Sequence, residues 1–122
     1  MSEHIEQTRL FQILELYEGK YPILRWVFAI PNGGHRIKSV AVKMKSEGVR
    51  AGVWDIFVPV AVEGFSGLFI EMKFGKNKLT SKQKKFMDMV GGAYQFSVCY
   101  DGIKAARVIG DYLDICELRS LE

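Results

Sequence analysis

The sequence predicts an α/β fold in which a mixed β-sheet is flanked by helices. Apolar runs of strand length alternate with longer segments of helical periodicity, in the order α-β-α-β-β-α-β-α. Two runs are joined by a short turn, which predicts an antiparallel hairpin, and a later strand-helix-strand connection predicts a parallel pair. The 122 residues, 48% of them hydrophobic, are expected to form one domain over residues 1–122.

The first part of the chain predicts two helices with a strand between them. Residues 3–18 have apolar side chains at steps of three and four, which is typical of an amphipathic helix. Residues 23–30 are rich in aromatic and β-branched side chains and predict the first strand, which the turn at 31–34 ends. Residues 35–47 predict the second helix, and Gly48 ends it.

The middle of the chain predicts a hairpin. Residues 55–60 and 68–73 are two apolar runs, and the segment 62–67 between them contains glycine and serine. Such a connection is short enough for the two strands to pair as neighbours.

The last part predicts a helix, a strand and a second helix. Thr80 and Gln83 have the spacing of a capping box, so a helix is expected from there to about residue 90, with Phe86, Met89 and Val90 facing inward. Residues 94–100 predict the fourth strand, and residues 102–113 predict the last helix. The remaining tail is expected to be frayed.

The basic residues gather in two windows, although the net charge is only +3. The two windows lie around the acids Asp55 and Glu71, and this arrangement predicts a site that holds a polyanion over a metal ion. For each single lysine, the alternative is a solvated helix face. Asn32, in the turn at 31–34, is expected to reach phosphate, and the alternative is an ordinary turn asparagine. The residues expected to contact nucleic acid are Asn32, Arg36, Lys38, Arg50, Lys76, Lys78 and Lys82.

The two cysteines, Cys99 and Cys116, lack metal-ligand spacing. Free thiols fit a reducing compartment, and the sequence has neither signal-peptide character at its start nor an apolar segment of membrane-spanning length. We therefore expect a cytoplasmic protein, in a bacterial cell or a phage-infected host, with no membrane partner.

Three charged side chains occur where apolar strands begin or end. Asp55 opens one run, and Glu71 and Lys73 close the next. Residues two apart in a strand point to the same face, and pairing of the two runs would bring Asp55 close to Glu71. Because half-buried acids are costly unless they are paired or bind metal, this arrangement predicts a divalent-metal site acting on a phosphodiester. The alternatives are a strand-start aspartate and an exposed ion pair.

Further groups are candidates for the same site. The main-chain carbonyl of Met72 can add an oxygen ligand, and Glu6 is a candidate third acid from the first helix. Glu6 as a solvent-facing helix residue and Gln83 as a capping residue are the alternatives. Gly52 would allow a close backbone approach, and the sequence leaves open whether Trp54 is exposed or buried.

Together these motifs resemble the PD-(D/E)XK nuclease superfamily and, more closely, the VRR-NUC (virus-type replication-repair nuclease) family. The resemblance extends over nearly the whole chain, from the first helix to about residue 113. One departure is Trp54, which stands where the family usually has proline. The matching residues, in chain order, are Glu6, Pro31-Asn32, Gly52 to Asp55, Glu71 with Lys73, and Gln83.

The resemblance implies a restriction-endonuclease-like fold and a magnesium- or manganese-dependent endonuclease without an organic cofactor. Asp55, Glu71 and the Met72 carbonyl would bind the metal, with Glu6 as an additional ligand. Lys73 would position the attacking water, and Gln83 would complete the site. Family members made of this domain alone are mostly of phage or bacterial origin, and their closest relatives in the superfamily are Holliday-junction resolvases, which act as homodimers on branched DNA.

Three alternatives stay open. A flap or restriction-like nuclease of the same superfamily would use the same residues on another DNA geometry. A non-catalytic DNA-binding module could keep the fold, although the complete set of site residues argues against it. A basic RNA-binding domain would need aromatic residues interleaved with basic ones on a sheet face, whereas the aromatic residues here lie within apolar runs.

Overall fold

A single mixed sheet organises the computed structural model, which describes residues 2–31 and 37–122. The strands lie in the order β1-β2-β3-β4, and the first three pair antiparallel while β3 and β4 pair in parallel. Their bounds are Phe28–Ala29 for β1, Ile56–Val58 for β2, Gly67–Met72 for β3 and Tyr94–Cys99 for β4. The predicted hairpin and the predicted parallel pair are both confirmed.

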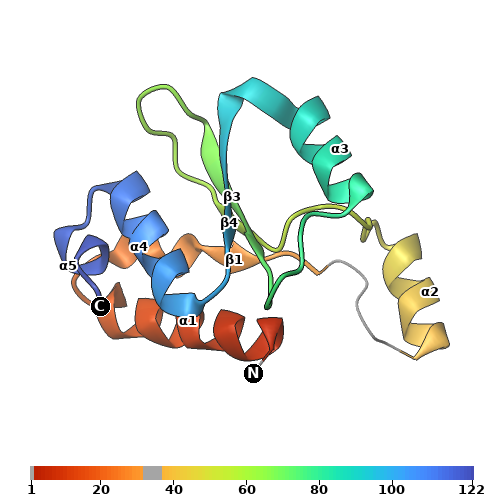
Figure 1. The fold of residues 1–122 in the computed structure, drawn as a ribbon, viewed down its shortest axis with the longest axis horizontal. Helices are drawn as coiled ribbons and strands as arrows, with labels where there is room; N and C mark the ends of the chain where they lie inside the picture. The colour runs from red at the N-terminus through yellow and green to blue at the C-terminus, as the bar shows by residue number, and fades with distance from the viewer. Residues whose placement is uncertain (1, 32–36) are drawn as a thin grey trace.

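Helices cover the two faces of the sheet unequally. Figure 1 shows α1, α4 and α5 gathered on one side, α3 on the other, and α2 lying away from the sheet. No helix in the described ranges is long and apolar enough to cross a membrane. The bounds are Glu3–Glu18 for α1, Lys38–Ser46 for α2, Ser81–Val90 for α3, Gly102–Leu113 for α4 and Cys116–Arg119 for α5, with 3-10 turns η1 at Pro22–Trp26 and η2 at Gly91–Ala93.

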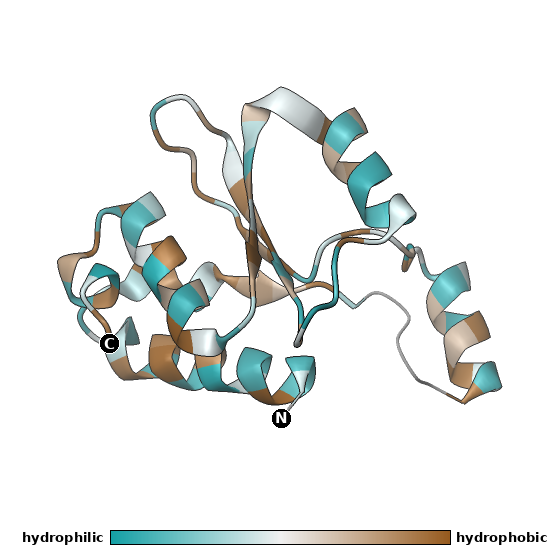
Figure 2. Cartoon of the chain, in the orientation of Figure 1, coloured by the Kyte–Doolittle hydropathy of each residue, from teal (hydrophilic) through white to brown (hydrophobic). Residues whose placement is uncertain are grey.

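Strand β3 is buried along its whole length because both of its faces are covered. Leu68, Ile70 and Met72 belong to the main hydrophobic core, together with residues of α1 and α4. Phe69, on the opposite face, stacks between Phe57 and Phe96 at ring-centroid distances of 4.5 and 5.4 Å. The hydropathy colours of Figure 2 show brown through the centre of the sheet. Glu71 follows on the face of Phe69, so the strand carries an acid toward α3.

The first strand is much shorter than the sequence predicts. Residues 22–26 form a 3-10 turn, and only Phe28 and Ala29 pair with β2. Pro22 explains the difference because its fixed φ and missing N–H suit the first turn of a helix. Burial of Leu24 and Val27, three residues apart, follows the turn and not the alternation of a strand.

The C-terminal tail is ordered, contrary to the expectation of fraying. It forms α5, and the side chains of Ile115 and Leu118 are buried in the main core. Gly110 permits this close packing, because a Cβ at that position would lie only 2.6 Å from Leu118 Cβ. Two apolar residues three apart were the signal for this short helix.

The inward face predicted for α3 is correct only in part. Phe86 packs edge-on against Phe69 at 5.2 Å, as expected. Met89 is 77% exposed, so its predicted inward position is wrong. Val90 is 38% exposed, so its predicted inward position is wrong as well.

Candidate active site

Asp55 and Glu71 meet at the place where β2 begins and β3 ends. The register pairs Ile56 with Ile70, so the residues next to them in the two antiparallel strands are neighbours. The backbone N–H of Asp55 donates to Oε1 of Glu71 at 3.2 Å, and the N–H of Met72 donates to Oδ2 of Asp55 at 2.8 Å. The structure thus brings together the two acids that the sequence pattern singled out.

Two further predicted residues contact the carboxylate of Glu71. The ammonium of Lys73 lies 3.4 Å from Oε2 of Glu71, and the side-chain amide of Gln83 donates to the same oxygen at 2.8 Å. The amide oxygen of Gln83 accepts from the N–H of Thr80, and the hydroxyl of Thr80 accepts from the N–H of Gln83. The capping box is confirmed, and one glutamine side chain therefore links the start of α3 to the acid pair.

The charged groups at this position are buried, and burial changes the protonation of Glu71. Glu71 is 3% exposed and Lys73 is 6% exposed. Burial, together with the negative charge of Asp55, raises the pKa of Glu71 from its usual 4.5 to about 8, although Lys73 opposes the rise. One lysine therefore does not neutralise the pair, and an additional positive charge would stabilise both carboxylates in their ionised form.

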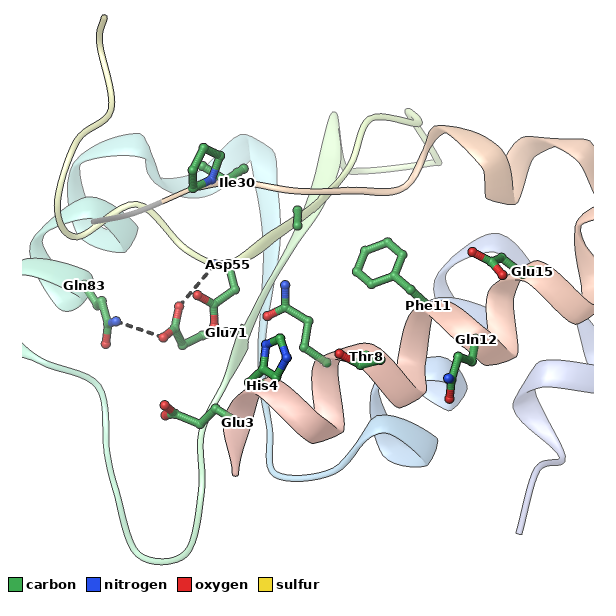
Figure 3. A pocket seen from close by; sticks show the side chains of 13 residues that line it. Glu3, His4, Thr8, Phe11, Gln12, Glu15, Ile30, Asp55, Glu71 and Gln83 are labelled. Atoms are coloured by element: carbon green, nitrogen blue, oxygen red, sulfur yellow. Dashed lines mark hydrogen bonds between the residues drawn. The ribbon is translucent and has the colours of Figure 1, made fainter. Parts of the chain in front are cut away.

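The acids line a cleft with a volume of about 980 Å³. Gln83 from α3 lies on the same wall, and α1 supplies the facing wall, which includes Glu3, His4 and Gln7. Figure 3 shows Glu3 and His4 projecting from the start of α1 toward Asp55 and Glu71. Sequence reasoning missed these α1 residues because polar side chains on an amphipathic helix are usually in solvent. The sequence signal for these residues was a second polar stripe at helical spacing on α1, beside the predicted acid Glu6.

Glu6 lies on a different side of α1 and does not line this cleft. It is 2% exposed, its carboxylate forms an ion pair with Arg9 at 2.9 Å, and it accepts from the N–H of Gly102 at 3.0 Å. Gly102 is the first residue of α4, so Glu6 joins α1 to the N-terminus of that helix. A role of Glu6 in the metal shell remains a prediction.

The donor set at Asp55 and Glu71 fits Mg²⁺ or Mn²⁺. Both carboxylates supply hard oxygen donors. Mg²⁺ is commonly held by one or two carboxylates, while substrate phosphate and water fill the other positions. Within residues 2–31 and 37–122, no group of three or more His, Cys, Asp or Glu side chains is arranged to hold a metal. A site here would therefore depend on these two acids, with the predicted Met72 carbonyl, and on ligands that arrive with the substrate.

Trp54 is buried, which the sequence left undecided. It is 1% exposed, its ring contacts Phe96 edge-on at 5.0 Å, and its indole N–H donates to the main-chain carbonyl of Gln83 at 3.0 Å. Gly52, two residues earlier, has φ +92°, and a Cβ there would lie 2.9 Å from Cβ of Lys82. The close backbone approach predicted for this glycine is therefore made to α3.

The predicted nucleic-acid contacts fall on several elements, and five of the seven lie within the described residues. Lys38 is on α2 and Arg50 on the loop after it, Lys76 and Lys78 are on the loop between β3 and α3, and Lys82 is in the first turn of α3; all five are exposed. Lys82 directly precedes Gln83 at the cleft. Asn32 and Arg36 lie outside the described residues.

Comparison with known families assigns the chain. A family model for the VRR-NUC domain matches residues 1–101. The chain belongs to the VRR-NUC family. A solved structure described as a VRR_NUC domain protein is similar in fold, with a TM-score of 0.66, 23% sequence identity and 88% of each chain covered. No curated protein matches the chain.

The VRR-NUC domain is a nuclease domain of the PD-(D/E)XK type, and its substrate is DNA. The four-stranded mixed sheet flanked by helices agrees with that fold, so the predicted family and fold class are confirmed. In this VRR-NUC chain, Asp55 and the Glu71–Lys73 pair stand in the order that the motif requires. Trp54 stands where the family usually has proline. Asp55 nevertheless contacts the β3 backbone, since the N–H of Met72 donates to its carboxylate.

Proposed function

We propose that this VRR-NUC chain is a Mg²⁺- or Mn²⁺-dependent endonuclease that hydrolyses phosphodiester bonds in branched DNA, with four-way junctions as its substrate. One observation supports the proposal above all others. Two carboxylates from neighbouring strands, Asp55 and Glu71, meet in a cleft wall, and a buried lysine and an amide contact one of them.

In the proposed reaction, Asp55 and Glu71 hold the metal, which when bound lowers the pKa of a water ligand and offsets charge on the phosphate. Gln83 keeps the Glu71 carboxylate in one orientation through its amide N–H. Lys73 has its ammonium group beside this carboxylate, from where it orients the attacking water or balances charge on the scissile phosphate. The exposed lysines around the start of α3 bind phosphates on either side without reading sequence.

The choice of a junction rests on geometry. The nuclease fold takes up the described residues 2–31 and 37–122, and we propose that this domain recognises DNA by its shape and through phosphate contacts. Two symmetric nicks across a junction need two active sites related by a two-fold axis, which a homodimer supplies. We therefore propose a homodimer as the active form.

A cleavage assay on three labelled substrates tests this function. A four-way junction, a flap and a plain duplex of matching sequence are incubated with the protein in Mg²⁺ or Mn²⁺, with EDTA as the control. We expect paired symmetric nicks in the junction only, together with a sedimentation mass of twice the chain.

Each other outcome removes a defined part of the proposal. Cleavage of the flap or the duplex in preference to the junction would overturn the substrate and keep the metal-dependent nuclease. Binding of DNA without any cleavage would favour the non-catalytic module.

A further inference from the structure

The residue before the first acid connects two parts of the candidate site. Trp54 directly precedes Asp55 in the chain, and its side chain is enclosed between the sheet and α3. One edge of its ring contacts Phe96 of β4, and its indole N–H donates to the main-chain carbonyl of Gln83 at 3.0 Å. The residue therefore touches a strand on one side and the first turn of a helix on the other.

Helix α3 depends on a small number of such contacts. None of its residues is fully buried. Its aromatic contacts are those of Phe86 with Phe69 and Phe96. At its start, the backbone of Gly52 lies close to Lys82, and the main-chain carbonyl of Gln83 accepts from Trp54. Two contacts at the helix start therefore come from the segment 52–54, which leads to Asp55.

These contacts form a closed ring around the acid pair. Trp54 donates to the main chain of Gln83, the side chain of Gln83 donates to Glu71 at 2.8 Å, and Glu71 accepts from the N–H of Asp55 at 3.2 Å. Asp55 is covalently joined to Trp54, which completes the ring. A shift of α3 would therefore reach the Glu71 carboxylate through Gln83.

We propose that Trp54 is a positioning residue for the metal site, acting through Gln83 on the Glu71 carboxylate. This inference rests on the proposed function because it assumes that Asp55 and Glu71 bind a divalent metal. Groups that orient metal ligands from behind typically change metal affinity by about 10- to 100-fold when they are removed. The indole N–H is the group that should matter, since the hydrophobic part of the ring only fills space against Phe96.

The first experiment substitutes Trp54→Phe, which keeps an aromatic ring and removes the N–H donor. We expect the Mg²⁺ concentration for half-maximal cleavage to rise about tenfold, with recovery of kcat at high Mg²⁺ and no change in the KM for DNA. Trp26→Phe is the matched control, because Trp26 is 62% exposed and belongs to η1, outside the cleft lining. An unchanged Mg²⁺ dependence in Trp54→Phe would overturn the proposal.

A second experiment needs neither cleavage nor a folded Trp54 variant. The chain has two tryptophans, so Trp26→Phe leaves Trp54 as the single tryptophan, which is excited selectively at wavelengths where tyrosine does not absorb. Titration with Mg²⁺ or Ca²⁺ should shift the emission of Trp54, and adding Asp55→Asn should abolish the shift. Calorimetry on the same samples reports whether metal binds at all. It therefore distinguishes a chain that binds metal without cleaving DNA from a chain that binds no metal. Metal binding with no change in Trp54 emission would contradict the proposed link.

Discussion

At the residue scale, Glu71 carries a buried carboxylate that its surroundings do not fully neutralise. It has Lys73 and Gln83 as partners, yet burial and the charge of Asp55 still raise its pKa to about 8. A fold gains nothing from such a group by itself, since an apolar residue of similar size would avoid the cost of burial. The divalent-cation site proposed above would account for the acid at this position.

The raised pKa of Glu71 gives a prediction for stability in EDTA. Its folded pKa is about 8 and its usual value is 4.5, so the folded state binds the proton more tightly. The resulting stabilisation is full below pH 4.5 and is lost as the pH rises to about 8, at up to about 1.4 kcal/mol for each pKa unit. The measurement is the free energy of unfolding in urea between pH 5 and 9, for wild type and for Glu71→Gln.

The variant isolates this contribution, because its residue 71 does not titrate. We expect the wild type to lose stability relative to Glu71→Gln as the pH rises, and saturating Mg²⁺ to recover the loss in the wild type alone. A difference between the two proteins that is constant with pH would contradict the buried, protonated acid.

At the scale of elements, the start of α3 couples helix formation to the site. Thr80 caps the helix, and Gln83 completes the capping box while it also contacts Glu71. Thr80→Ala should lower the free energy of unfolding by about 1 kcal/mol, since one N–H of the first turn loses its acceptor. Urea denaturation measures the change.

Ser81→Ala is the matched control for this substitution. It removes a hydroxyl one position later, where the capping hydrogen bond of Thr80 is not involved. We expect Ser81→Ala to change stability by less than about 0.5 kcal/mol. Equal effects of the two substitutions would show that the capping box does not stabilise α3.

The elements also show what could be read from the sequence. The hairpin and α3 could be predicted because local signals decide them, namely a short turn between apolar runs and the pair Thr80 and Gln83. The pairing of Asp55 with Glu71 followed from the hairpin. The first strand was overestimated because a proline turn replaced most of an apolar run, and α5 was missed because its burial depends on the space above Gly110.

The α1 side of the site could not be derived in the same way. Glu6 was selected as the acid of the first helix, but it faces Arg9 and the start of α4. His4 and Gln7 line the cleft instead. Which side of an amphipathic helix faces a cleft depends on how the helix packs on the sheet, and helical periodicity alone does not contain that information.

At the scale of the whole molecule, basic residues surround the start of α3 while α4 covers the opposite face of the sheet. If DNA lies over the cleft, each lysine near α3 contributes one phosphate contact. Lys78→Ala should weaken binding to all DNA sequences alike and reduce the slope of log K against log salt by about 1. Fluorescence anisotropy at several salt concentrations measures both quantities.

Lys104→Ala on α4 is the control for the same loss of charge at an exposed position. We expect its affinity and salt slope to remain those of the wild type. If Lys104→Ala weakens binding as much as Lys78→Ala does, the DNA does not lie over the α3 side of the molecule.

The central claim is a metal-dependent nuclease centre at Asp55 and Glu71. Its most direct test compares DNA cleavage by wild type, Asp55→Asn and Lys73→Ala. The three proteins are compared in Mg²⁺ and in EDTA on a labelled four-way junction, and binding of the same DNA is followed by anisotropy. We predict that the wild type cleaves only with metal, and that both variants bind DNA but lose cleavage by at least about a hundredfold. Cleavage retained by both variants, or by the wild type in EDTA, would contradict this site.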